Sequence, residues 1–168
     1  MGEIRVFFAK SSDKSDVYRL LETAVQQVYG ISMPTLQKDE NGKPYFLDRG
    51  DIHFSLSHSG EYVMCAISDS PVGCDVQKYQ EISDKVQKRI FTDKELEFSD
   101  PLSLWGLKES FIKLHGKLDR EYKNMEFLKC EDVFRGPDNT FGVLINEIQG
   151  YAAAICAYNR DNVKVLML

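Results

Sequence analysis

The chain contains the stretch Leu104-Trp105-Gly106-Leu107-Lys108-Glu109-Ser110-Phe111-Ile112-Lys113, whose spacing predicts a helix with two different faces. Apolar residues recur at helical intervals and form a stripe that can pack against a core: Leu104, Leu107, Phe111 and Leu114. Trp105, Glu109 and Lys113 are four residues apart, so a helix places them together on another face. The stretch therefore predicts a helix that is anchored on one side and presents an indole, an acid and a base on another.

The region before this helix contains both helix and strand patterns. A β-rich segment at Ile4–Ala9 leads into an amphipathic helix at Ser15–Tyr29, with Ser15 as the expected N-cap and Gly30 as the stop signal. Turn chemistry over Asp39–Gly50 predicts a loop. Three short strands with short connections, which favour antiparallel pairing, are then expected: His53–Ser57, Tyr62–Ser68 and Val72–Gln77.

Helices and then strands fill the rest of the chain. A basic amphipathic helix is expected at Ser83–Ile90, and Thr92 begins a capping box with Glu95 ahead of the helix at Ser103–His115. Four further strands are expected: Phe127–Phe134, Thr140–Glu147, Tyr151–Asn159 and Val163–Leu168. The order predicts the α+β class, with residues 1–77 (strand, helix, three strands) and 78–168 (helices, then strands) as two halves.

Composition narrows the class of protein. The formal net charge is −5 over 168 residues and no basic cluster stands out, so a nucleic-acid partner is not expected. The N-terminal apolar run is too short for a signal peptide and no window could span a bilayer, which predicts a cytoplasmic protein without a membrane partner. The four cysteines lie in apolar surroundings without a C-x-x-C pair, as buried thiols in a reducing compartment do.

The acids Asp75 and Glu109, together with Gln77, provide the first candidate site. Asp75 and Gln77 lie two residues apart on an expected strand and point to one face. Facing Glu109, they would suit magnesium, which favours oxygen ligands and binds one or two carboxylates together with substrate phosphates. The competing interpretation is that Asp75 ends a strand and Glu109 forms an i, i+4 surface pair with Lys113.

Two further motifs are weaker when taken alone. His58, next to Ser57 at the end of an apolar strand, can donate to a phosphate oxygen or can simply occupy a turn. Lys43 and Pro44 follow a glycine, which is consistent with a ligand-binding loop or with an ordinary turn.

Taken together and in this order, the motifs resemble those of the 4'-phosphopantetheinyl transferase superfamily, specifically its longer, surfactin-synthetase-type branch. The resemblance covers roughly residues 40 to 120 and rests on four segments: Gly42–Pro44, Phe54–Ser59, Val72–Asp75 and Trp105–Lys113. Members transfer the 4'-phosphopantetheine group of coenzyme A to a serine of an apo acyl or peptidyl carrier protein and release adenosine 3',5'-bisphosphate. The resemblance implies a magnesium-dependent enzyme, a holo-acyl-carrier-protein synthase, built as a monomer.

The resemblance also implies an architecture and residue roles. Two similar α/β halves, each a small antiparallel sheet packed with helix, would form a pseudo-dimer with coenzyme A between them. Asp75, Gln77 and Glu109 would be the metal positions. The coenzyme A positions would be Lys43, Pro44, Ser57, His58 and Lys113, and the catalytic positions Glu109, Lys113 and Glu95, with the base either Glu109 or Glu95.

Two departures from the family pattern carry expectations. Many relatives have a glutamate at the position of Gln77, so we expect weaker magnesium affinity with activity retained. The N-terminal region is short, and Lys10, Lys14 and Arg19 are possible replacements for the basic residues that bind the coenzyme A 3'-phosphate. Two rival interpretations remain: a non-catalytic coenzyme-A- or carrier-binding member of the family, and a structural α+β protein.

Overall fold

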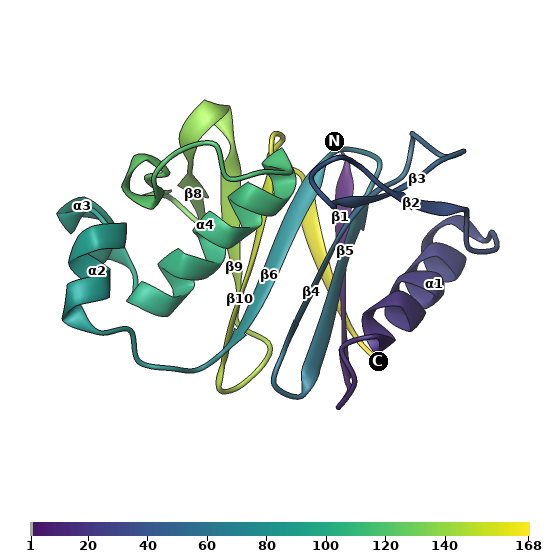
Figure 1. Cartoon of the computed structure of the whole chain (residues 1–168), viewed down its shortest axis with the longest axis horizontal. Coiled ribbons are helices and arrows are strands. Elements are labelled where there is room, and N and C mark those ends of the chain that lie inside the picture. Colours follow the sequence, from purple (N-terminus) through teal and green to yellow (C-terminus); the bar gives the residue numbers. More distant parts are fainter. Residues whose placement is uncertain (1) are drawn as a thin grey trace.

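The computed structural model describes residues 2–168 and has the α+β architecture that the sequence predicts (Figure 1). One sheet has the order β11-β1-β5-β4, with β1 at Glu3–Lys10, β4 at His53–Ser59, β5 at Tyr62–Ser68 and β11 at Asn162–Met167. A second has the order β6-β10-β9-β8-β7, with β6 at Val72–Lys78, β7 at Leu128–Cys130, β8 at Val133–Arg135, β9 at Phe141–Ile145 and β10 at Tyr151–Ala157. All their pairings are antiparallel except β1 with β11, which is parallel.

Two of the helices cover the outer faces of these sheets. α1 spans Asp16–Tyr29, α2 Asp84–Ile90, α3 Asp93–Phe98 and α4 Pro101–His115, and single 3-10 turns lie at Tyr122–Asn124 (η1) and Pro137–Asn139 (η2). α1 packs on the first sheet and α4 on the second (Figure 1). Within residues 2–168, no helix is long and apolar enough to cross a membrane.

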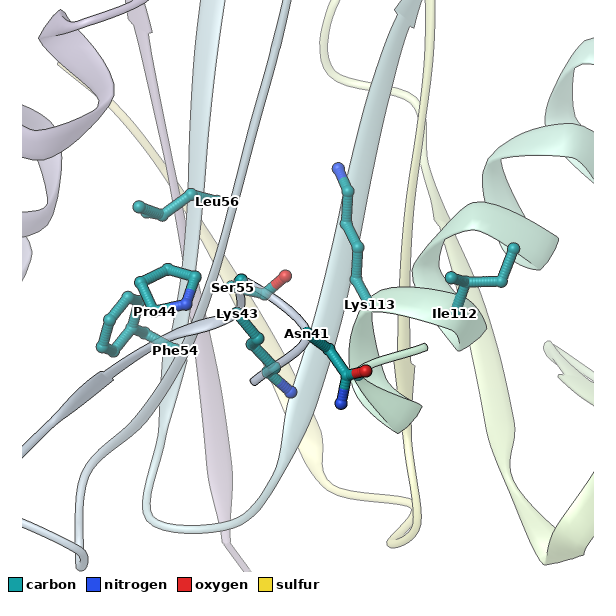
Figure 2. Close-up of a pocket in the computed structure, with 10 residues that line it drawn as sticks. Asn41, Lys43, Pro44, Phe54, Ser55, Leu56, Ile112 and Lys113 are labelled. Atoms are coloured by element: carbon teal, nitrogen blue, oxygen red, sulfur yellow. The ribbon is translucent and has the colours of Figure 1, made fainter. Parts of the chain in front are cut away.

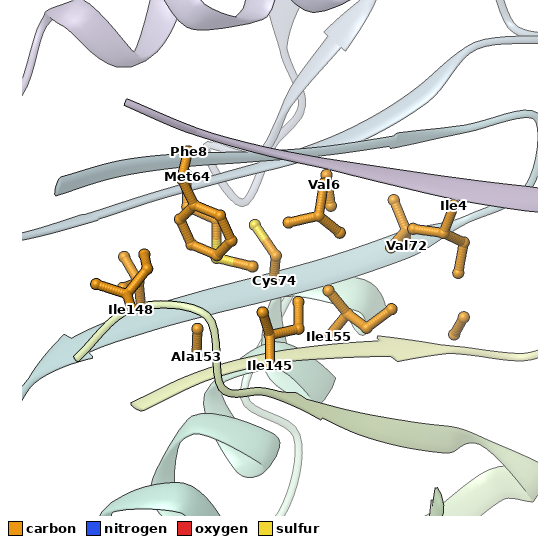
Figure 3. Close-up of a cluster of buried hydrophobic side chains, with 13 residues drawn as sticks. Ile4, Val6, Phe8, Met64, Val72, Cys74, Ile145, Ile148, Ala153 and Ile155 are labelled. Atoms are coloured by element: carbon orange, nitrogen blue, oxygen red, sulfur yellow. The ribbon is translucent and has the colours of Figure 1, made fainter. Parts of the chain in front are cut away.

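The two sheets face each other across a shared apolar core. Figure 3 shows this cluster, with side chains from β1 and β5 on one side and from β6, β9 and β10 on the other. Along β6, Val72, Cys74 and Val76 point into the core. The alternation of a strand therefore turns Gly73, Asp75 and Gln77 towards α4, as the sequence predicted for the two polar residues.

The predicted pairing of the three consecutive strands is only half correct. β4 and β5 pair antiparallel as expected, but the predicted pairing of β5 with β6 is wrong, because β6 pairs with β10 in the other sheet. β11, from the C-terminal half, joins β1 in the first sheet. Each of the proposed halves, 1–77 and 78–168, thus contributes one strand to the sheet formed mainly by the other: β6 to the second sheet and β11 to the first. The division at residue 77 stays a prediction.

Serine hydroxyls join the edges of the two sheets where a β-ladder is absent. The Oγ atoms of Ser55, Ser57 and Ser59 on β4 accept hydrogen bonds from successive outward N–H groups of β6, at 3.0, 3.1 and 2.9 Å. The first two of these bonds are buried, and without the serines their N–H donors would be unpaired at a cost of roughly 1–3 kcal/mol each. The alternating serines of the Phe54–Ser59 motif therefore have a structural role that spacing alone did not reveal.

Three local predictions need correction. The expected loop over residues 39–50 contains β3 (Pro44–Phe46), which pairs with β2 (Leu36–Lys38) as a small separate sheet. The single strand expected at 127–134 is divided into β7 and β8, because Glu131 has a left-handed φ of 58° and reverses the chain. Ser15 occupies the N-cap of α1 without a side-chain bond to the helix, and Asp13 Oδ1 accepts from its N–H instead.

Gly73 allows α4 to lie directly on β6. A Cβ at this position would lie 1.9 Å from the carbonyl oxygen of Ser110 and 2.5 Å from the backbone nitrogen of Leu114. Both atoms belong to the helix backbone and cannot rotate away. A side chain at residue 73 would therefore push the whole helix off the strand.

We expect Gly73→Ala to lower the free energy of unfolding by about 1–3 kcal/mol or more, the usual cost of overpacking, in urea denaturation. Gly106→Ala is the matched control, since the nearest atom to its added Cβ is Ala154 Cβ at 3.6 Å and alanine favours a helix interior by up to about 1 kcal/mol. Equal stability of the two variants would contradict the account.

Candidate active site

Asp75 is a buried carboxylate with three protein donors. It is 2% exposed, and its Oδ1 accepts from Lys113 Nζ at 3.0 Å and from the Ser57 hydroxyl at 3.1 Å. Its Oδ2 accepts from the amide nitrogen of Gln77 at 2.9 Å. β6 thus presents the Asp75 carboxylate to α4 in a defined orientation.

Glu109 faces the same place from α4. Burial raises the pKa of the Glu109 carboxyl, the hydrogen bond from Tyr122 opposes that shift, and the nearby Asp75 charge adds to it. The Lys113 charge acts in the opposite direction and lowers the pKa of Glu109, so Asp75 and Lys113 both influence this carboxyl. Lys113 binds Asp75 rather than Glu109, so the hypothesis of an isolated Glu109–Lys113 surface pair is wrong.

A cavity of about 260 Å³ adjoins these charges and is lined by Lys113, Lys43, Pro44 and Phe54, among others (Figure 2). Lys113 therefore lines the cavity and also forms an ion pair with Asp75. Lys43 Nζ donates to the carbonyl of Leu114 at 3.1 Å, which ties the β2–β3 hairpin to the end of α4, and burial lowers the pKa of the Lys43 ammonium.

Some of the other predicted site residues contact Asp75, and others lie outside this site. Ser57 and Gln77 contact Asp75 directly, whereas His58 lies exposed on the opposite side of β4 from the serine row. Trp105 stacks on Tyr122, with ring centroids 5.0 Å apart and planes 10° apart. The structure thus brings together Asp75, Gln77, Glu109, Lys113 and Ser57, with Lys43 and Pro44 across the cavity.

Glu95 lies away from this group, in the core between α3 and α4. Its side chain is fully buried and pairs with the equally buried Lys108, 2.7 Å away. Its Oε1 also accepts from the Phe127 N–H at 2.9 Å, and its Oε2 from the Thr92 N–H at 2.8 Å, within the predicted capping box. Both oxygens of Glu95 are therefore occupied by structural donors.

Sequence reasoning missed Tyr122. Its hydroxyl donates to Glu109 Oε1 at 2.8 Å, and burial together with the neighbouring Glu109 raises the pKa of the Tyr122 phenol, so the proton stays on the tyrosine. The residue lies in the one-turn η1, outside the motif helix. No motif signals it, because its contact with Glu109 depends on how the chain after α4 folds back.

The donors at this site suit a hard divalent cation. Within residues 2–168, no cluster of three or more histidine, cysteine, aspartate or glutamate side chains could hold a metal ion. Two carboxylates, from Asp75 and Glu109, remain, whereas Gln77 presents its amide nitrogen to Asp75. Magnesium uses one or two protein carboxylates and takes its other oxygens from water and substrate phosphates, so the residues fit such an ion.

One protein family matches the segment of the chain that holds Asp75 and Glu109. The family model described as the 4'-phosphopantetheinyl transferase superfamily matches residues 71–157, about half of the chain and the segment that holds Asp75 and Glu109. The chain therefore belongs to this superfamily, as its motifs predicted.

Individual relatives match over a part of their length. The chain is 35% identical over 124 residues to the 4'-phosphopantetheinyl transferase Sfp of Bacillus subtilis (strain 168), covering 62% of this chain and 54% of that protein. It is 37% identical over 128 residues to the 4'-phosphopantetheinyl transferase gsp of Aneurinibacillus migulanus, covering 66% of this chain and 53% of that protein. The chain thus spans about half the length of the relatives it matches.

The buried pair between Glu95 and Lys108 predicts a stability effect without a direct catalytic one. Glu95→Gln leaves the Lys108 charge unpaired in the core, so we expect a loss of about 3–5 kcal/mol in the free energy of unfolding, measured by urea denaturation. The exposed Glu97→Gln on the same helix should change it by less than about 0.5 kcal/mol. A Glu95→Gln protein as stable as the parent would refute the structural role.

Proposed function

We propose that this protein transfers the 4'-phosphopantetheine group of coenzyme A to a serine of an apo acyl or peptidyl carrier protein and releases adenosine 3',5'-bisphosphate. The observation that carries the proposal is the convergence of Asp75, Lys113 and Glu109 from β6 and α4 beside a cavity. Superfamily membership supports it, since relatives are named 4'-phosphopantetheinyl transferases.

The cavity suits one end of coenzyme A. At about 260 Å³ it lies just below the roughly 300–1,000 Å³ that encloses a whole small ligand, so it would take the adenosine portion. Pro44 and Phe54 offer apolar surface there, and Lys43 offers charge. The diphosphate would then extend along Lys113 towards the carboxylates.

Lys113 is the residue that would meet the diphosphate. Its ammonium has three donors, of which the Asp75 contact uses one. The transfer concentrates charge on phosphate oxygens, and positioned cations lower the barrier by stabilising that charge. A magnesium ion held by Asp75 and Glu109 would supply further charge neutralisation, and the Gln77 amide would have to turn its oxygen towards Asp75 to join them.

Glu109 is the better candidate for the base that takes the serine proton. It is only partly buried, and its raised pKa brings its proton affinity closer to what general-base catalysis at neutral pH requires. Glu95 is fully buried and its two oxygens are bound to Lys108 and to backbone N–H groups. We therefore assign Glu95 to the support of α4 within this proposal.

The surface offers partial support for the remaining binding roles. Lys85, Lys88 and Arg89 are all exposed on α2 and form a basic strip suited to an acidic carrier protein. Of the residues considered for the 3'-phosphate, Lys10 and Arg19 line a cavity separate from that of Lys43. The 3'-phosphate contact is therefore best sought around Lys43.

The first test is transfer itself. Incubation of the protein with coenzyme A, magnesium and an apo carrier protein should increase the carrier's intact mass by one phosphopantetheine. Lys113→Ala should lower kcat/KM by about 10²–10³, as the loss of one transition-state charge contact does. Lys117→Ala, exposed just beyond α4, should transfer normally. Calorimetric binding of coenzyme A without any mass gain would instead favour the non-catalytic alternative.

A second test concerns Gln77. In Gln77→Glu, a third carboxylate would face the metal position. A charge pair near 4 Å is worth about 4 kcal/mol at an effective dielectric of about 20, so we expect magnesium to bind at least about tenfold more tightly in calorimetry. Without magnesium the variant should be less stable, because an amide donor to Asp75 is replaced by a like charge.

The control for that experiment is Gln80→Glu, an exposed position two residues beyond β6, which adds the same charge away from Asp75. Equal magnesium affinity in Gln77→Glu and Gln80→Glu would exclude Gln77 as a metal position.

A further inference from the structure

Three side chains of the Trp105–Lys113 motif converge on one residue outside it, Tyr122. The Trp105 ring stacks on the tyrosine ring at 5.0 Å. Lys108 Nζ donates to the Tyr122 carbonyl at 2.9 Å. Glu109 Oε1 accepts the Tyr122 hydroxyl at 2.8 Å. Ring, backbone and hydroxyl of the same residue are thus each held by α4.

The η1 turn that carries Tyr122 is itself rigidly attached. Lys108 Nζ, buried against Glu95, also donates to the carbonyl of Met125 at 2.7 Å, and Met125 is buried in the core beside α4. Lys123 Nζ donates to the carbonyl of Lys88 at 2.8 Å and ties the turn to α2. The tyrosine hydroxyl therefore reaches Glu109 from an element that cannot readily move.

The hydroxyl restrains a side chain that would otherwise be free to turn. Glu109 has three rotatable bonds, and its neighbour Lys113 binds Asp75 rather than Glu109. With Oε1 held by Tyr122, Oε2 is the oxygen left for a cation or a proton. Asp75 is oriented in the same manner by Ser57 and Gln77, so each carboxylate of the pair has its own protein donor.

We propose that Tyr122 is a positioning residue that orients Glu109 so that Oε2 faces the divalent cation shared with Asp75. The inference rests on the proposed function for the identity of the cation site, but it concerns metal binding and not transfer. Partners that hydrogen-bond a metal ligand commonly change metal affinity or activity about 10- to 100-fold when removed. Tyr122 has the geometry of such a partner.

The test is Tyr122→Phe, which keeps the ring on Trp105 and the carbonyl on Lys108 and removes only the hydroxyl. Magnesium is titrated into the protein without coenzyme A or carrier, by calorimetry and by the fluorescence of Trp105, the single tryptophan of the chain. We expect about 10- to 100-fold weaker binding, and in transfer assays a lower kcat with the KM for coenzyme A unchanged. The midpoint of urea unfolding should fall only by the cost of the one lost hydrogen bond to Glu109.

Two further variants separate positioning from packing. Tyr158→Phe removes a hydroxyl that lies 3.4 Å from His115 Nδ1 and should bind magnesium as the parent does. Tyr122→Leu should also lose the stacking contact, shift the Trp105 emission and unfold earlier. Parent-like magnesium affinity in Tyr122→Phe, or no magnesium binding by the parent, overturns the inference. Weaker binding in Tyr122→Phe upholds it even if no transfer is found, which would refute the proposed function alone.

Discussion

The close approach of α4 to β6 is the constraint on which the rest of the structure depends. Only a glycine at residue 73 lets the backbone of the helix rest against the strand, because a Cβ there would lie 1.9 Å from the Ser110 carbonyl. That contact fixes the position of Asp75 on the strand relative to Glu109 and Lys113 on the helix. Two elements that are distant in sequence can then share one charged site. The Lys113 ammonium offsets the repulsion between the Asp75 and Glu109 carboxylates there.

Much of the motif helix serves to hold this geometry in place. Lys108 is a charged residue that is fully buried, and it pairs with Glu95 while donating to two backbone carbonyls. Such a pair contributes little net stability over an apolar pair, but it is costly to break and it requires one particular arrangement. It therefore defines where the chain after α4 lies, and with it Tyr122.

Local sequence patterns determine some features of this site, and contacts between distant segments determine the others. The helix over Trp105–Lys113 and its apolar stripe follow from 3.6-residue periodicity, and the shared face of Asp75 and Gln77 follows from the period of a strand. Both are local properties. The role of Glu95 was left open because an acid in a capping box looks the same in sequence whether it reaches a substrate or a buried lysine. One interpretation paired Lys113 with Glu109, because Glu109 is its i, i+4 neighbour on the helix. In the structure Lys113 pairs with Asp75, which is close to it only in the folded chain.

The sequence by itself determined the α+β class, most element positions and the family, since all of these depend on short-range patterns or on motifs, and it singled out Asp75 and Glu109 as candidate site residues. Tertiary structure alone decided that β6 leaves β5 for the second sheet, that the serines of β4 bond its edge, and that Tyr122 binds Glu109. The physical reason is that strand partners and buried hydrogen bonds are chosen by which donors and apolar surfaces meet across the whole chain. No window of neighbouring residues contains that information.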